Sequence, residues 1–411
     1  MSDETATEAE GPAPGMTECA VCETDVPAGE FCGLCGWHLT EKPRSGPSWL
    51  RWRSFSGAAG ENLFTPNITS SLFPQLPAGS RLPFLVGLCL LVACLIAATL
   101  FRLPAVLITV AALGLPLLFL YYLQEADAHR DIPPSTLVLT AGLGIAIGVG
   151  WVLLTGAAVA RSYGVPLGAG ITAGRIFLDG LGVPLGGMVL MLVPAALVRL
   201  RRRGTQESLD GFAIGALGAL MFTGAATLTR LAPQFTGGVV ARARPMAGLM
   251  VEAGIRGIAV PLTAASVGGL VGAALWFTRP ANKVHQHRNY VRLTLALIVV
   301  AVFAMYAGAG LVDVARVPQI VQLVVHLALA AVALLALRVG LHLALLHEAH
   351  DEARSDEPIL CTECGHVVPD MPFCAACGAA MHASSRSSRQ ARRETRPVLV
   401  ESASDPAGED Q

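Results

Sequence analysis

Eight stretches of this chain are long and apolar enough to cross a lipid bilayer, which excludes a single soluble enzyme domain. Each helical crossing needs about 20 apolar residues at a rise of about 1.5 Å per residue. Hydrophobic residues make up 53% of the chain and charged residues only 14%, so most of it belongs in lipid. The predicted helices cover roughly residues 84–101, 103–123, 136–160, 176–198, 212–229, 257–277, 293–312 and 320–346. We therefore predict an all-α polytopic membrane protein whose surroundings are membrane lipid.

Basic residues beside the predicted spans indicate the orientation, because loops rich in Arg and Lys stay in the cytoplasm. An even number of crossings places both termini on one side, together with the loops after the fourth and sixth spans. Those segments carry Lys42, Arg44, Arg51, Arg53, Arg81, Arg199, Arg201, Arg202, Arg203, Lys283, Arg288 and Arg292. The opposite loops are poorer in Arg except around Arg242, Arg244 and Arg256. We expect both termini to be cytoplasmic.

The cellular setting is inferred from composition. The acidic first 16 residues lack the basic region and apolar stretch of a cleavable signal peptide, so we expect none. Lysine is nearly absent while Ala and Gly abound, a usage typical of GC-rich bacterial genomes. The predicted location is therefore a bacterial plasma membrane.

Eight of the ten cysteines fall in two clusters with identical spacing at opposite ends of the chain. Each cluster has two C-x-x-C pairs separated by nine residues. The first holds Cys19, Cys22, Cys32 and Cys35, and the second holds Cys361, Cys364, Cys374 and Cys377. The repeat extends further, since Val26-Pro27 and Phe31 recur at the same offsets as Val368-Pro369 and Phe373. This pattern indicates an internal duplication.

The cysteine spacing predicts one structural zinc ion in each cluster. Four thiolates on two tight turns suit tetrahedral zinc, and Gly36 and Gly378 can adopt the positive φ that such turns need. Four protein ligands fill the coordination shell, so catalysis at either ion is not expected. Iron, a redox C-x-x-C pair or disulfides are the alternatives, and a reducing cytoplasm disfavours the last. Cys89 and Cys94 lie in an apolar run and are interpreted as small hydrophobic residues.

These features divide the chain into seven predicted segments. They are a disordered acidic N-terminus (1–16), a zinc ribbon (17–38), a linker (39–82), a transmembrane bundle (83–347), a linker (348–358), a second zinc ribbon (359–381) and a disordered tail (382–411). Small residues such as Gly268-Gly269 and Gly272 should allow close helix packing in the bundle.

One part of the bundle carries a family resemblance. Its anchors are the basic stretch 199–203, Asp210-Gly211 opening a helix that contains Phe222, and Arg256 followed by Pro261-Leu262 and Gly272. On these residues, positions 184–277 resemble the core of the PrsW family of intramembrane metalloproteases. The resemblance implies a Glu-Glu pair before the basic stretch, a Glu four residues after the phenylalanine and a His after the Pro-Leu step. In that family these groups together bind a metal ion and activate water.

This sequence lacks each of those groups. The Glu-Glu position falls at about Gly186 to Met188, the following Glu position is Ala226, and the His position is Ala264. A zinc hydrolase needs about three protein ligands and a general base. We therefore assign no catalytic residue and no cofactor-binding residue in the bundle, and we expect a non-catalytic relative, a pseudoprotease.

Ionisable residues at membrane depth are costly, which makes each one a candidate site. Asp179 is expected to pair with Arg175, Asp210 to cap the fifth span, and Glu252 to pair with Arg256.

One arginine and four histidines lie in the last span or just after it. His326 is interpreted as a packed, hydrogen-bonded residue, and Arg338 is expected to extend towards the cytoplasm. His342, His347 and His350 should continue the helix out of the bilayer.

The C-terminal tail is basic and rich in serine. It is read either as an arm for anionic lipid or nucleic acid, or as a solvated tail. The first ribbon is surrounded by Glu18, Glu23, Asp25 and Glu30, which makes nucleic acid an unlikely partner and favours a protein. The favoured function is a membrane scaffold or regulator whose ribbons bind a protein partner. An intramembrane protease using Asp179, Asp210 or Glu252 and a small-molecule transporter are the alternatives.

Overall fold

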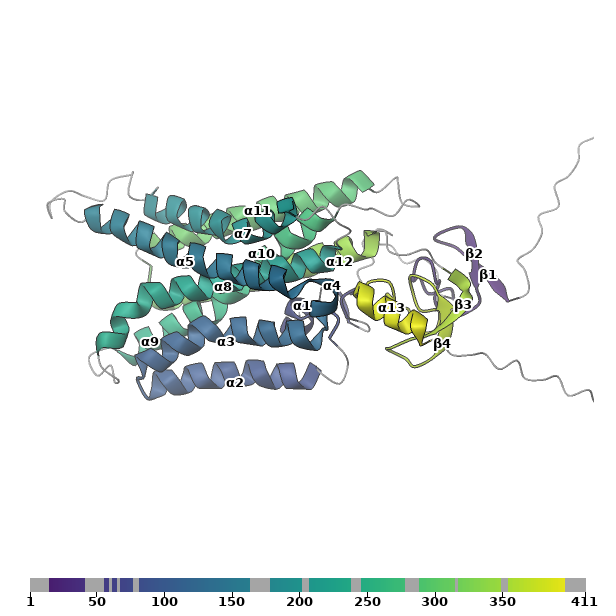
Figure 1. The fold of residues 1–411 in the computed structure, drawn as a ribbon, viewed down its shortest axis with the longest axis horizontal. Coiled ribbons are helices and arrows are strands. Elements are labelled where there is room, and N and C mark those ends of the chain that lie inside the picture. The colour runs from purple at the N-terminus through teal and green to yellow at the C-terminus, as the bar shows by residue number, and fades with distance from the viewer. Residues whose placement is uncertain are drawn as a thin grey trace, which may run out of the picture. The chain divides into compact units, whose positions relative to one another are not determined.

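The chain forms two compact units in the computed structural model (Figure 1). One unit is Trp49–His350, and the other joins Met1–Ser48 to Asp351–Gln411. The structure describes residues 15–40, 55–58, 61–64, 67–76, 81–162, 178–201, 207–237, 245–277, 288–314, 317–348 and 354–395.

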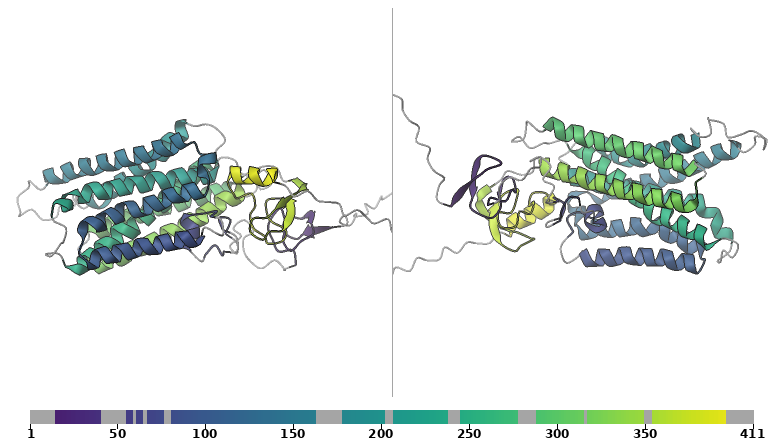
Figure 2. Two further views of the ribbon diagram at one scale, coloured as in Figure 1. Left: turned by 60° about the horizontal axis from the view of Figure 1, so that its bottom comes forward. Right: turned by 180° about the vertical axis from the view of Figure 1, so that it is seen from behind.

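The unit Trp49–His350 is a helical bundle whose long helices run side by side (Figure 1, Figure 2). Among the described residues, eight helical segments are long and apolar enough to cross a membrane, in agreement with the eight predicted spans. The long helices are α2 (Arg81–Leu100), α3 (Pro104–Glu125), α5 (Pro134–Ser162), α7 (Val183–Arg201), α8 (Ser208–Leu231), α10 (Val260–Trp276), α11 (Arg288–Val314) and α12 (Gln319–His347). Shorter elements are α1 (Ile68–Leu72), α4 (Ala128–Asp131), η2 (Leu178–Gly182), η3 (Ala232–Gly237), α9 (Met246–Gly254) and η4 (Ile255–Ala259).

The sixth span begins earlier than the predicted residue 257. It runs without a break from Met246 through α9, η4 and α10 to Trp276. The π-turn η4 ends two residues before Pro261, whose nitrogen cannot donate to the preceding turn. A π-turn is a common way to carry a helix past such a defect. The apolar pattern alone did not reveal that the helix continues through this point.

Helix α8 lies at the centre of the bundle, where it packs against α3, α5, α7, α10 and α12. Its closest approach is to α10, through Gly211 and Gly215 on one side and Gly268 and Gly272 on the other. A Cβ atom added at Gly215 would overlap the carbonyl of Gly268, and one added at Gly211 would overlap the carbonyl of Gly272. The expected close packing of small residues is thus present at the α8–α10 contact.

Replacing Gly215 by valine should therefore destabilise the bundle. We expect Gly215→Val to lower the free energy of unfolding by about 1–3 kcal/mol or more, because the added atoms meet backbone that cannot rotate away. Thermal unfolding of the purified protein in detergent, followed by circular dichroism, measures the effect. Gly142→Val in α5 is the matched control, since a Cβ there meets no atom within 4 Å. Equal melting temperatures for the two variants would contradict this account of the packing.

A segment before the first span folds back onto α12. The described residues between Phe55 and Leu76 lie in the stretch expected to be a linker, and most of them are buried. Their anchor is Arg338, which is fully buried. It donates hydrogen bonds to the backbone oxygens of residues 62 and 63, at 3.0 Å each, and to the hydroxyls of Ser70 and Ser71.

Arg338 also makes an ion pair and a cation–π contact. A guanidinium nitrogen of Arg338 lies 2.9 Å from a carboxylate oxygen of Glu61, and its guanidinium carbon lies 4.0 Å from the ring centre of Phe55. One turn further along α12, the backbone N–H of Ser56 donates to Nδ1 of His342 at 3.1 Å. The helix continues through His342 and His347, as expected. Arg338 and His342 are both buried, because the folded-back segment covers them and supplies their partners, which the sequence did not reveal.

The described residues of the second unit form two β-hairpins and one helix. The strands are β1 (Met16–Cys19), β2 (Thr24–Pro27), β3 (Arg354–Leu360) and β4 (Val367–Asp370), and the helix is α13 (Arg386–Glu394). Strand β1 pairs antiparallel with β2, and β3 pairs antiparallel with β4. The two ends of the chain thus build one unit from two copies of the same supersecondary element.

Candidate metal centres

Each hairpin brings the four cysteines of its cluster together. In each cluster the four sulfur atoms lie within 4.8 Å of one another, and these two groups are the candidate metal sites found in the described residues. They comprise Cys19, Cys22, Cys32 and Cys35, and Cys361, Cys364, Cys374 and Cys377. All eight predicted ligands therefore converge as the spacing indicated.

The sulfur geometry fits a tetrahedral ion. A Zn–S bond of about 2.3 Å places four tetrahedral sulfurs about 3.8 Å apart. The Cys361–Cys377 and Cys364–Cys374 sulfurs are separated by 3.8 Å, and the corresponding pairs of the first cluster by 3.5 Å. A disulfide needs about 2.05 Å, and none of the ten cysteines forms one. The arrangement favours metal over a disulfide, and an S₄ tetrahedron accepts zinc or iron.

Tight turns set the position of the ligands. In the second turn of each cluster, Gly36 donates its N–H to the carbonyl of Cys32, and Gly378 does the same to Cys374. Their φ angles are +66° and +71°, in the left-handed region that glycine adopts without strain. The predicted role of these two glycines is confirmed.

Crowding of the thiols shifts their pKa values in opposite directions. The hydrogen bond between Cys22 and Cys32 raises the pKa of Cys22 to about 12 and lowers that of Cys32 to about 2. In the second cluster the hydrogen bond that the Cys361 thiol donates to Cys374, together with burial, raises the pKa of Cys361 to about 12. Four sulfur anions at these distances repel one another, so a bound dication is needed to hold all four as thiolates.

The two ribbons pack against each other with approximate twofold symmetry. The N–H of Phe31 donates to the carbonyl of Ala375 at 2.9 Å, and the N–H of Phe373 donates to the carbonyl of Gly33 at 2.8 Å. Phe31 and Phe373 occupy the same place in the repeat, as do Gly33 and Ala375. The Phe31 ring covers Gly378, and the Phe373 ring covers the equivalent glycine of the first ribbon. Two modules at opposite ends of the sequence are thus one paired structure.

Helix α13 lies in the region expected to be a disordered tail. Ser385 caps its first turn, and Arg389 is buried. Arg393 donates to a carboxylate oxygen of Asp370 at 2.8 Å, and His382 contacts the other oxygen at 3.2 Å. Burial alone would raise the pKa of Asp370, but the hydrogen bonds from His382 and Arg393 outweigh it and lower that pKa. These tertiary contacts order a sequence whose composition indicated disorder.

No protein family, curated protein or solved structure matches this chain. The sites must therefore be interpreted from their own geometry.

The positions implied by the PrsW resemblance hold no metal ligands. Gly187 and Met188 are buried in α7, and Ala264 is buried in α10. Ala226 lies in α8. None of these positions offers the carboxylate, imidazole or thiolate that binds zinc, or a group that can accept a proton.

Other polar residues of the bundle are engaged with neighbours. Glu252 lies 3.9 Å from Arg256, as predicted. His326 is buried, with Nδ1 2.8 Å from the carbonyl of Gln322 and Nε2 3.4 Å from Asp313. The packed, hydrogen-bonded role predicted for His326 is confirmed.

Two acidic side chains cap or contact the start of α8. Asp210 accepts a hydrogen bond from the N–H of Glu207 in a capping box at the start of α8, so its predicted capping role is confirmed. Both carboxylate oxygens of Glu348 accept from the N–H of Ser208 at 3.0 Å, a contact with no sequence signal. The predicted Asp179–Arg175 pair and His350 lie outside the residues and side chains that the structure describes.

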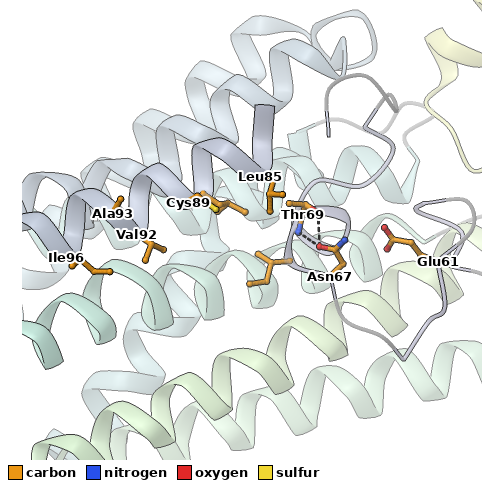
Figure 3. A pocket seen from close by; sticks show the side chains of 10 residues that line it. Glu61, Asn67, Thr69, Leu85, Cys89, Val92, Ala93 and Ile96 are labelled. Carbon is orange, nitrogen blue, oxygen red and sulfur yellow. Dashed lines mark hydrogen bonds between the residues drawn. The ribbon is translucent and has the colours of Figure 1, made fainter. Parts of the chain in front are cut away.

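An open groove of about 860 Å³ runs along α2 (Figure 3). Its wall is formed by apolar side chains and Cys89, and its polar end by Glu61, Asn67 and Thr69. At this end, one carboxylate oxygen of Glu61 binds Arg338, and the Asn67 amide oxygen accepts hydrogen bonds from Thr69. The groove offers alkyl chains a surface and shows no acid–base pair for catalysis.

Proposed function

We propose that this protein is a non-catalytic, multi-pass scaffold or regulator of a bacterial plasma membrane, with a cytoplasmic module that contains two structural zinc ions. The observation that carries the proposal is the convergence of the eight cysteines into two closed S₄ sets. Such sets leave no coordination position for a substrate or water, so zinc there stabilises a fold. A small zinc-held module outside the bilayer is suited to binding another protein.

The orientation belongs to the same proposal. The ribbons come from opposite ends of the chain and belong to one unit, which supports both termini on the same side of the membrane. Eight crossings satisfy this condition. Arg199 and Arg201, at the end of α7, support the cytoplasmic side.

The absence of protease groups at the aligned positions supports a PrsW-like pseudoprotease over an active enzyme. All of those positions carry apolar residues, and they lie in the packed helices α7, α8 and α10. The acidic and exposed side chains of the first ribbon, including Glu18, Asp25 and Glu30, favour a protein partner with a basic surface.

Metal stoichiometry tests this proposal directly. We expect the purified full-length chain to carry two zinc ions by inductively coupled plasma mass spectrometry. Changing all eight ribbon cysteines to serine should remove both, whereas Cys89→Ser with Cys94→Ser, the control, should remove neither. A zinc ion that remains in the eightfold variant would contradict the non-catalytic reading and support an intramembrane metalloprotease. A wild-type chain without zinc or with iron would contradict the assignment of the ribbons.

A further inference from the structure

The two ribbons carry different residues at some equivalent positions of their interface, although Phe31 and Phe373 are the same in both. The first ribbon has Gly29 and Gly33 where the second has Met371 and Ala375. These positions face each other across the interface: Gly33 meets Met371, and Gly29 meets Ala375. One ribbon thus supplies two gaps, and the other supplies the side chains that fill them.

The fit is tight at both positions, so an added side chain would force its neighbour to move. A Cβ atom added at Gly33 would overlap the sulfur of Met371 and lie 2.8 Å from its terminal carbon. A Cβ atom added at Gly29 would lie 2.7 Å from the carbonyl oxygen of Ala375 and 3.0 Å from its Cβ. Neither glycine has a positive φ, so it is the neighbouring ribbon that restricts the residue type here.

The same geometry disfavours pairs of like ribbons. Two copies of the second ribbon would set Met371 against Ala375 twice, with the overlap just described. Two copies of the first ribbon would leave both gaps empty. Overpacking and unfilled cavities each destabilise a contact, so the unlike pair is the one that the side chains fit.

The interface also connects the two metal sites. Phe31 and Gly33 flank the ligand Cys32, and Phe373 and Ala375 flank the ligand Cys374. The two hydrogen bonds between the ribbons therefore join the turn that holds one ligand to the turn that holds the other. Forming either turn around its ion places the backbone groups that the partner ribbon needs.

We propose that the N-terminal ribbon is built to recognise the C-terminal ribbon, and that through this unlike pairing metal binding at one end of the chain strengthens metal binding at the other. This inference rests on the proposed function, because it requires that both cysteine sets bind metal. Both ribbons are tethered to the same bundle, and the resulting high effective concentration favours pairing within one chain. The two ends thus act as one cooperative two-metal unit.

Cobalt(II) titration of the full-length chain in nanodiscs tests the coupling, because a tetrahedral thiolate site absorbs visible light when it binds cobalt. Changing the four cysteines of the first ribbon to serine should weaken cobalt binding at the second ribbon by about 5- to 150-fold, the usual range of coupling between sites. An unchanged affinity would overturn the coupling. A chain in which neither ribbon yields the thiolate spectrum would instead overturn the proposed function.

Exchanging the interface residues of the two ribbons tests the pairing itself. Gly29→Met with Gly33→Ala gives the first ribbon the residues of the second, and it should weaken cobalt binding at the second ribbon as loss of the first site does. Adding Met371→Gly and Ala375→Gly restores one gap opposite each side chain, so the fourfold variant should regain most of the affinity. A local folding defect at Gly29 or Gly33 would not be repaired by changes in the distant ribbon. Failure of the exchange to restore the affinity would overturn unlike pairing.

Discussion

Removing the metal should unfold both ends of the chain and leave the helical bundle folded. Metal binding contributes about 10–16 kcal/mol to structural zinc modules of comparable size, more than their small cores can supply. The core of the first ribbon is little more than its cysteines, Val26 and a few partly buried neighbours. A strong zinc chelator should therefore expose residues 15–40 and 354–395 to protease.

Limited proteolysis with tags at each terminus measures this effect, and circular dichroism follows the bundle in the same sample. The helical signal should be retained, because in its described part the bundle contains no cluster of potential metal ligands. Added zinc should restore protection at both ends. Ribbons that stay resistant to protease after the metal is removed would contradict a metal-held fold.

Loss of Arg338 is expected to be the most damaging single change in the bundle. Arg338→Met removes the cation that Glu61 faces and leaves that carboxylate without its counter-ion, although Ser70 still donates a hydrogen bond to it. Breaking a buried ion pair from one side costs about 3–5 kcal/mol, because an uncompensated charge remains. We expect a lower unfolding midpoint in a denaturant titration and faster protease cleavage between Phe55 and Leu76.

Two further variants show whether the loss of stability comes from the unpaired charge. Arg338→Met combined with Glu61→Met should be less damaging than Arg338→Met alone, since the double variant leaves no unpaired charge. Arg130→Met is the control, because Arg130 and Asp127 form an exposed pair at 3.5 Å that contributes at most about 1 kcal/mol. Equal stability of the Arg338 and Arg130 variants would show that the segment before α2 is held by other contacts.

The sequence was sufficient to predict the features that depend on composition and spacing. Hydropathy predicted eight spans, since about 20 consecutive apolar residues have few alternatives to a membrane helix. The C-x-x-C spacing predicted both ligand sets, because two thiolates on one tight turn can reach one ion. Each of these signals is local, and each is present in the structure.

Features that depend on distant partners could not be predicted in this way. Arg338 in an apolar run is compatible with reaching the lipid surface or with a buried partner, and Glu61, far away in the sequence, decides between them. The Arg- and Ser-rich composition of α13 indicates disorder, and the contacts of Asp370 order it. The sequence gives only a weak signal of the ribbon pairing: one repeat has glycine where the other has Met371 and Ala375.

The pairing of the two ribbons also bears on how the chain is made. The N-terminal ribbon is synthesised first, and its partner follows only after α12. The first ribbon therefore lacks its partner while all the helices between them are being made. Pairing of the ribbons requires that the C-terminal ribbon has been made and lies on the same side of the bundle as the first.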